Sequence, residues 1–498
     1  MTFPTRFAAA VVLSATLSAC AVTPHPLTTA EIDASATAVR TDATANQEPL
    51  TGPIDLYEAM ARALKYNLDY KVEQLQQALK DRELKLSTYD MLPQLVGSAA
   101  YFGRSNQAGA SSRSLLSGVQ SLEPSTSTEK NVATADLSLS WDVLDFGLSY
   151  VRARQKADGV LIAAEERRKV SNRIIEDVRT AYYRAVSAQR LLTKLGELQG
   201  MITTTLSNSE RLAQNRKSAP LIALTYQREL VEIEQTVKSL SRELQIAKAQ
   251  LAALMNLDPG TDYELVLPPR DAALPVVALT ADDEVATALR NRPELRQLGY
   301  QQRINKRELD AQILSMFPSL KGYVGLNADS NSFLYNNNWV QYGARTSFNL
   351  LNVFRLPAAK KAVKAEGSVL QARELATAMA VMTQVYVARA RYGLYGSELD
   401  TARHSYAVQG KIMTQITGGY KAGAISQQTL LREQMNTLVS EVRYDIAYAD
   451  AQNAYANLYA AMGVDSFTPD VGAAQSVRTL ADSLKAMWAR RAVALGAQ

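Results

Sequence analysis

Residues 230–254 read LVEIEQTVKSLSRELQIAKAQLAAL and carry the clearest structural signal in the chain. Apolar side chains recur there at alternating intervals of three and four residues, which is the a/d seam of coiled-coil packing. The members of this seam are Leu230, Ile233, Val237, Leu240, Leu244, Ala247, Leu251 and Leu254. A quieter seam lies upstream and consists of Ile174, Val178, Ala181, Ala185, Ala188, Leu192 and Leu195. Residues 146–254 are therefore predicted to form two helices folded back on each other.

The first of these helices is predicted to be very long. No proline interrupts residues 148–219, and a helix over most of that span would be roughly 100 Å long at about 1.5 Å per residue. The return helix, about residues 221–256, is much shorter. Another helix must cover the remaining length, and we expect it from residues 54–91, whose pattern is also helical.

The chain contains two copies of one unit. Pro93-Gln94-Leu95 returns as Pro318-Ser319-Leu320, and Arg82-Glu83-Leu84 returns as Arg307-Glu308-Leu309, each 225 residues later (318 against 93, 307 against 82). A constant offset indicates a repeat. We predict repeat 1 at 52–258, an equatorial linker at 259–278 and repeat 2 at 279–465. Repeat 2 should carry its own long helix, about residues 356–417, with a turn and a return helix.

Each repeat also carries two stretches typical of β-strands. In residues 133–143 apolar and polar side chains alternate strictly, so that each kind falls on one face. Residues 340–350 alternate similarly, and weaker partners lie at 95–104 and 320–328. Each stretch is about ten residues long, which is the length of a membrane β-strand. A half-buried sheet in a soluble domain is the alternative, but the long helices offer such a sheet no evident cover.

Both ends of the chain are predicted to lie outside the repeats. Residues 1–19 resemble a lipoprotein signal peptide, with Arg6, a short apolar run and the ending Leu17-Ser18-Ala19-Cys20. Cys20 is then the lipidation site, whereas an ordinary signal peptide is the alternative. Residues 20–51 are rich in Thr, Ala and Pro and are predicted to form a flexible lipidated tether. Residues 466–498 form a C-terminal tail with an amphipathic pattern.

Composition excludes several classes of function. The 498 residues include 54 Lys and Arg against 49 Asp and Glu, and these charges are spread along predicted helix faces, so no nucleic-acid-binding surface is expected. One cysteine and two histidines, His25 and His404, are too few for a usual metal site. No nucleophile motif or phosphate-binding loop is present. We therefore expect neither an enzyme nor a cofactor.

The strands point to an assembly of several chains. No further stretch reaches the ~18 apolar residues of a membrane helix, so any membrane span is expected to consist of strands. Four strands cannot close a membrane barrel, since the smallest have about eight. An open sheet edge in lipid leaves backbone groups unpaired, so several chains would have to pool their strands.

Two short motifs add a resemblance to a known family, the TolC-type outer-membrane efflux proteins in their lipoprotein branch. Asn291-Arg292-Pro293-Glu294-Leu295 resembles the family's repeat-start motif, and Tyr420-Lys421-Ala422-Gly423, followed by Leu430, resembles its hairpin-tip motif. Repeat 1 departs from both motifs, because Asn67-Leu68-Asp69 lacks the proline and Asn215-Arg216-Lys217-Ser218 lacks the tyrosine and the glycine.

The resemblance implies an α+β membrane protein. Three chains would form a homotrimer with a 12-strand β-barrel, four strands from each, continued by a long α-helical coiled-coil barrel in the periplasm. It implies outer-membrane lipid around the barrel, a periplasmic adaptor and an inner-membrane RND or ABC pump. The substrates would be drugs, metals or other toxic small molecules. A type I protein secretion channel and a non-channel periplasmic coiled-coil lipoprotein remain the alternatives.

The resemblance also assigns adaptor docking and gating to the hairpin tips. The residues concerned are Tyr420, Lys421, Gly423, Leu430 and, in repeat 1, Ser218. In the family, charged side chains near this turn hold the tunnel end closed. Here Gln427, Gln428 and Thr429 begin the return helix, with Arg432 a turn later, and no acidic ring is evident. Closure by side-chain packing and hydrogen bonds is therefore expected.

The lipid anchor gives the first testable prediction. Cells grown with a radioactive fatty acid should label the wild-type protein and leave Cys20→Ala unlabelled, because the acyl chain is attached to that cysteine. Immunoprecipitation followed by autoradiography measures the label. Equal label in both proteins would contradict acylation at Cys20.

Overall fold

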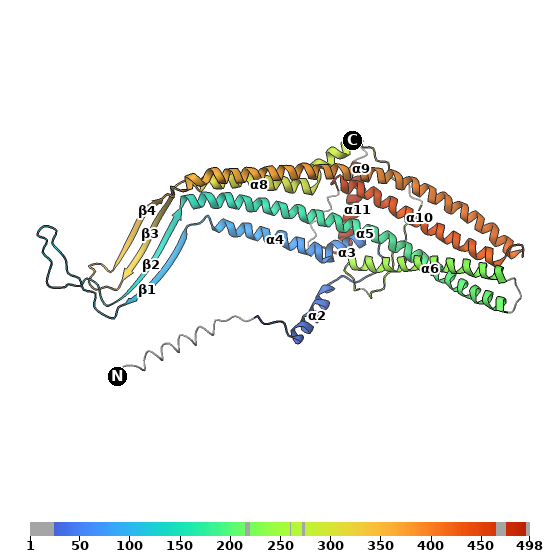
Figure 1. The fold of residues 1–498 in the computed structure, drawn as a ribbon, viewed down its shortest axis with the longest axis horizontal. Helices are drawn as coiled ribbons and strands as arrows, with labels where there is room; N and C mark the ends of the chain where they lie inside the picture. Colours follow the sequence, from blue (N-terminus) through green and yellow to red (C-terminus); the bar gives the residue numbers. More distant parts are fainter. Residues whose placement is uncertain (1–23, 215–219, 259, 271–273, 465–474, 495–498) are drawn as a thin grey trace.

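The structure, a computed structural model, describes residues 24–214, 220–258, 260–270, 274–464 and 475–494. Long helices lie side by side in an elongated layer, and a small sheet continues the layer at one end (Figure 1). The strands are β1 Gln94–Gly103, β2 Asn131–Asp142, β3 Ser319–Asp329 and β4 Asn338–Ser347. The helices are α2 Thr29–Ala43, α3 Leu56–Tyr66, α4 Leu68–Tyr89, α5 Val143–Gln214, α6 Pro220–Leu254, α7 Ala281–Asn291, α8 Pro293–Leu314, α9 Asn352–Lys421, α10 Gln427–Ala461 and α11 Val477–Ala494.

Two helices set the length of the molecule. α5 has 72 residues and α9 has 70, so each is about 105 Å long. α4 packs against the half of α5 nearer the sheet and α6 against the other half, while α8 and α10 divide α9 in the same way (Figure 1). The seam that the sequence indicates is the contact between α5 and α6, where Ala188, Leu195, Leu230 and Val237 are buried together.

The repeat is visible in the helix boundaries. α7 and α8 begin 225 residues after α3 and α4 (281 against 56, 293 against 68). The segment 54–91, expected as one helical stretch, is divided at Asn67, and its counterpart is divided at Arg292. The Asn67 side chain accepts hydrogen bonds from the Asp69 and Tyr70 amides at 3.0 and 3.2 Å. Pro293 opens α8 instead and has no amide to satisfy. The two copies thus make the same break with different residues.

The four strands form one antiparallel sheet in the order β1-β2-β3-β4. Their register places Leu139 between Leu95 and Val324, and Val324 beside Tyr342. The next row on the same face contains Leu137, Leu326 and Val340. Since side chains alternate between faces, Ser138 and its neighbours Val96, Gly325 and Gln341 lie on the other face. The sheet therefore has one apolar and one mainly polar face.

Within the described ranges, no other element covers the apolar face. The large apolar side chains of its two central rows are between 42% and 81% exposed, which is far more than apolar strand residues show inside a folded domain. Among the described residues, no helix combines the length and the apolarity needed to cross a membrane.

A belt of short elements lies across one face of the layer at mid-length. α3 and α11 pack on α5 through a shared apolar core that includes Met60, Leu64, Val178 and Leu480. The linker lies against α5, where Gln189 exchanges two hydrogen bonds with the backbone of Leu265 at 2.8 and 2.9 Å. The C-terminal tail thus contains a helix that is part of the fold: the Trp488 ring stacks on the Arg179 guanidinium at 4.5 Å.

The segment 20–51, predicted as a flexible tether, contains a helix in its described part. Residues 29–43 form α2, which begins with a reciprocal capping box between Thr28 and Glu31; two orphan amide groups are satisfied in this way. Further along, the Glu48 carboxylate accepts from Lys65 and from the Val477 amide at the start of α11. The helix is not evident from the apolar pattern of the sequence, because helix caps and ion pairs stabilise this segment and a hydrophobic core does not.

The two faces of β2 give a prediction. On the expectation that β2 spans the outer membrane, Leu139→Arg should lower the amount of folded protein there, because an arginine near the bilayer midplane costs about 2–4 kcal/mol on a lipid-facing surface. Ser138→Arg should be tolerated, since its side chain would face water. Unboiled SDS gels of outer-membrane fractions measure the folded assembly. The reverse ranking would exchange the assignment of the two faces.

Candidate functional site

The turn between α9 and α10 is a closed helix cap. Gly423 has a φ of +74°, a left-handed conformation that glycine adopts without steric cost. Its amide donates to the Tyr420 carbonyl at 3.0 Å, and the Ala424 amide donates to the Gly419 carbonyl at 2.9 Å. These two bonds define a Schellman motif. A Cβ atom on Gly419 would lie 2.5 Å from Ile425 Cδ1, so a larger residue there would require the Ile425 side chain to move.

Four of the predicted tip residues therefore meet at one end of the molecule. Tyr420 and Lys421 occupy the last turn of α9, and Gly423 follows them. Leu430 lies in the first turn of α10, whose N-cap Ser426 accepts from the Thr429 amide at 3.2 Å. A Cβ atom on Gly423 would meet nothing within 4 Å, so the turn leaves open space around this residue. Ser218 and Cys20 lie outside the described residues.

An acidic partner near this tip was not identified from the sequence. Arg432 on α10 forms a two-pronged ion pair with Glu229 on α6, with one contact at 2.8 Å. The two residues are 203 positions apart, and nothing local in the sequence pairs them. The sequence shows no acidic ring around the turn. The structure adds an ion pair near the turn that joins the two hairpins.

A cluster of charges joins the two hairpins at mid-length. Asp445 on α10 is almost fully buried and pairs with Arg190 of α5 at 3.0 Å and with Arg270 of the linker at 2.6 Å. Arg270 also reaches Glu441 at 3.2 Å, which in turn pairs with Lys194 at 2.8 Å. Burial raises the pKa of the Asp445 carboxyl, and the neighbouring arginines oppose that rise.

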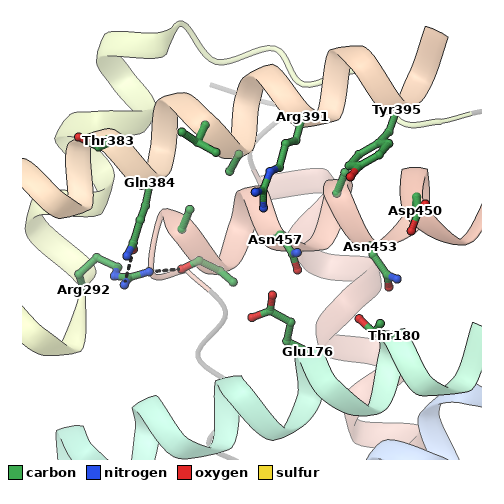
Figure 2. Close-up of a pocket in the computed structure, with 15 residues that line it drawn as sticks. Glu176, Thr180, Arg292, Thr383, Gln384, Arg391, Tyr395, Asp450, Asn453 and Asn457 are labelled. Carbon is green, nitrogen blue, oxygen red and sulfur yellow. Dashed lines mark hydrogen bonds between the residues drawn. The ribbon is translucent and has the colours of Figure 1, made fainter. Parts of the chain in front are cut away.

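The layer face opposite the belt carries a polar groove of about 620 Å³ (Figure 2). Asn453 and Asn457 point from α10 toward Glu176 and Thr180 on α5, and Arg391 enters from α9 (Figure 2). On α5 these groove residues point roughly half a turn away from the residues that contact α3 and α11. At this groove the uncovered face of α5 is therefore mainly polar, whereas the residues of α5 that face α3 and α11 are apolar.

The groove is lined by charged and polar side chains. Asp450 lines it, and burial raises the pKa of this carboxyl, with Arg184 opposing the rise. Both signs of charge are present, since Arg292 and Arg391 line the groove together with Glu176 and Asp450. Among the described residues, no cluster of three or more His, Cys, Asp or Glu could hold a metal ion.

Comparison with known proteins places the fold. No family profile matches the sequence, and no curated protein matches it. Solved structures do match. The Campylobacter jejuni CmeC outer-membrane channel is 15% identical, with 87% of this chain and 89% of that chain covered and a TM-score of 0.65.

Two further solved structures give a similar result. The open state of the Neisseria gonorrhoeae MtrE outer-membrane channel is 16% identical and has a TM-score of 0.62; the match covers 82% of this chain and 88% of that chain. The Vibrio cholerae outer-membrane protein VceC is 12% identical, covers 82% and 96%, and has a TM-score of 0.60. The chain therefore has the fold of the TolC-type outer-membrane channels, as its sequence motifs implied.

Proposed function

We propose that three copies of this chain form the outer-membrane channel of a tripartite export system. Such a channel receives small molecules from an inner-membrane pump and a periplasmic adaptor, and passes them across the periplasm and the outer membrane. The observation that carries this proposal is that the chain forms an open layer. Its outer helices expose apolar stripes, and its outer strands have unpaired backbone groups.

The first kind of edge is helical. α4 presents an apolar stripe with exposed fractions of 45–68%, made of Leu68, Val72, Leu75, Leu79 and Leu86. On the opposite side of the layer, α9 presents a stripe with exposed fractions of 50–70%, made of Val369, Leu375, Met379, Tyr386 and Leu394. The stripes are different surfaces, so copies would join edge to edge in a heterologous contact, which is satisfied everywhere only when a ring closes.

The second kind of edge is the sheet. β1 and β4 are its outer strands, and each lies on the same side of the layer as one of the helical stripes (Figure 1). Strand directions alternate, so β4 of one copy would meet β1 of the next in antiparallel orientation. Three copies supply twelve strands, enough to close a membrane barrel. Closure removes the unpaired backbone groups that lipid does not tolerate.

The two faces of the ring follow from the chemistry of the layer. The apolar face of the sheet would contact outer-membrane lipid, and its polar face would line the barrel lumen. The hydrophilic groove face of the helices would continue that lumen through the periplasm. A periplasmic lipoprotein without a channel is disfavoured, because it would leave the apolar sheet face in water.

The partners and the anchor complete the proposal. Tyr420, Lys421, Gly423 and Leu430 lie at the end of the molecule opposite the sheet, where a periplasmic adaptor would reach them. The pump would be of the RND or ABC class, and the cargo drugs, metals or other toxic small molecules. Cys20 would add a lipid anchor in the outer membrane. The same fold would serve type I protein secretion, and the identity of the partner pump distinguishes the two systems.

Substitutions on the edges test the assembly. Leu79→Arg on α4 and Met379→Arg on α9 should each abolish the trimer, because each interface would lose roughly 1.5–3 kcal/mol of apolar burial and gain a buried charge. Ile446→Arg is the matched control, since this residue is similarly exposed but lies on α10, away from both edges. Light scattering of detergent-purified protein gives the mass. A trimer that survives both edge variants would exclude these stripes as interfaces.

Substitutions of Gly423 test docking. Gly423→Trp should stop export and adaptor crosslinking while the trimer remains, because the bulky side chain projects into the open space at the turn. Gly423→Asn is the control, since asparagine tolerates the left-handed conformation and is small. Drug susceptibility and crosslinking to the adaptor are the measurements. Export and crosslinking that persist with tryptophan would leave Gly423 as a helix cap alone.

A further inference from the structure

The loop between β1 and β2 is an apolar exception in an exposed part of the chain. It spans residues 104–130, whereas its counterpart between β3 and β4 spans only 330–337. The longer loop is rich in Ser, Thr and Gly, yet its outer half carries Leu115, Leu116 and Leu122 with exposed fractions of 103%, 101% and 97%. Clustered exposed apolar side chains mark interaction sites, and no described part of the chain covers these three.

This loop is an ordered hairpin, which we call the arm. Residues 110 and 125 form an antiparallel bridge, as do residues 113 and 120. The turn at its tip is held by Arg113, whose Nε donates to the Gly118 carbonyl at 2.7 Å. At its base the buried Asn331 side chain accepts from the Glu129 amide at 3.2 Å and donates to the Ser127 carbonyl at 3.1 Å. The leucines are thus carried at the end of an arm whose root is fixed to the neighbouring loop.

The arm extends too far from the strands for its leucines to rest in lipid. Figure 1 shows it continuing past the ends of the strands and turning toward the β4 side. The ten residues of β1 already match the span of a membrane strand. About eleven more residues separate Gly103 from Ser114, which is a reach of up to roughly 36 Å.

The proposed trimer provides a place for these leucines. A ring of twelve strands about 4.8 Å apart and tilted by about 40° has a diameter of roughly 24 Å. The reach of the arm exceeds the radius of that ring, so three arms can meet on its axis. Resting on the proposed trimer, we propose that the hairpins of the three copies meet over the extracellular mouth, where Leu115, Leu116 and Leu122 form an apolar lid.

Disulfide crosslinking tests the contact. The only natural cysteine of the chain is Cys20, so Leu116→Cys introduces a single thiol at the tip. Mild oxidation of whole cells should convert on the order of two thirds of these chains into dimers, because only one pair can form among three tips on an axis. Ser127→Cys, at the root of the same arm, and the wild type should remain monomeric on denaturing gels.

A second measurement tests the lid itself. Ser138→Cys places a thiol on the polar face of β2, and a membrane-impermeant maleimide added outside the cells reports access to it. Replacing all three leucines by serine should accelerate this labelling at least fivefold, with an unchanged amount of trimer. An unchanged labelling rate would overturn the lid.

The remaining outcomes separate the inference from the proposed function. If the trimer forms but Leu116→Cys does not crosslink, the tips do not meet, and the inference is wrong while the channel stands. Labelling of that thiol by an aqueous maleimide would place the tips in water, and labelling only by a lipid-soluble maleimide would place them in lipid; either result overturns the lid. If light scattering finds no trimer, the proposed function fails, and the lid fails with it.

Discussion

The length of α5 is the constraint on which the rest of the molecule depends. No single return helix covers 72 residues, so two shorter helices meet end to end along it, and their termini fall in the middle of the layer. Helix termini leave carbonyl groups without partners. At the end of α10 two arginines supply donors: Arg292 to the Ala460 carbonyl at 3.2 Å and Arg168 to the Gly463 carbonyl at 2.5 Å. The belt thus lies at the height where these helix ends need partners.

α6 and α10 pack on α5 through one apolar cluster, which includes Leu438 of α10, and the contact with α10 adds ion pairs. The contact with α6 is an apolar seam, which includes Leu195 and Leu230. The contact with α10 contains the ion pairs of Asp445 and Glu441. A buried ion pair gains little net free energy, but the loss of one partner costs several kcal/mol. The apolar cluster therefore supplies cohesion among all three helices, and the ion pairs penalise any other alignment of α10 on α5.

Much of this architecture could be predicted from sequence because it is periodic. The spacing of Leu230 to Leu254 determined the α5–α6 pairing, and the alternation around Leu139 determined which side chains share a sheet face. The break at Asn67 was missed, because one asparagine cap makes little mark on a helical pattern. The Glu229–Arg432 pair was out of reach, since it joins helices from different repeats. α2 was missed because it buries no side chain, and hydropathy cannot detect a helix that depends on its cap.

The meeting of helix ends at one height has a mechanical consequence. Along most of the molecule each chain resists bending with four helices, but at the belt only α5 and α9 are continuous. Flexural stiffness should therefore have its minimum there, about midway along the helical layer. α3, α7 and α11 lie across this zone. Their apolar and cation–π contacts with α5 and α9 resist shear between the half of the layer near the sheet and the half near the tip. A sideways load on the far tip would then be absorbed at the belt, and the sheet would remain undisturbed.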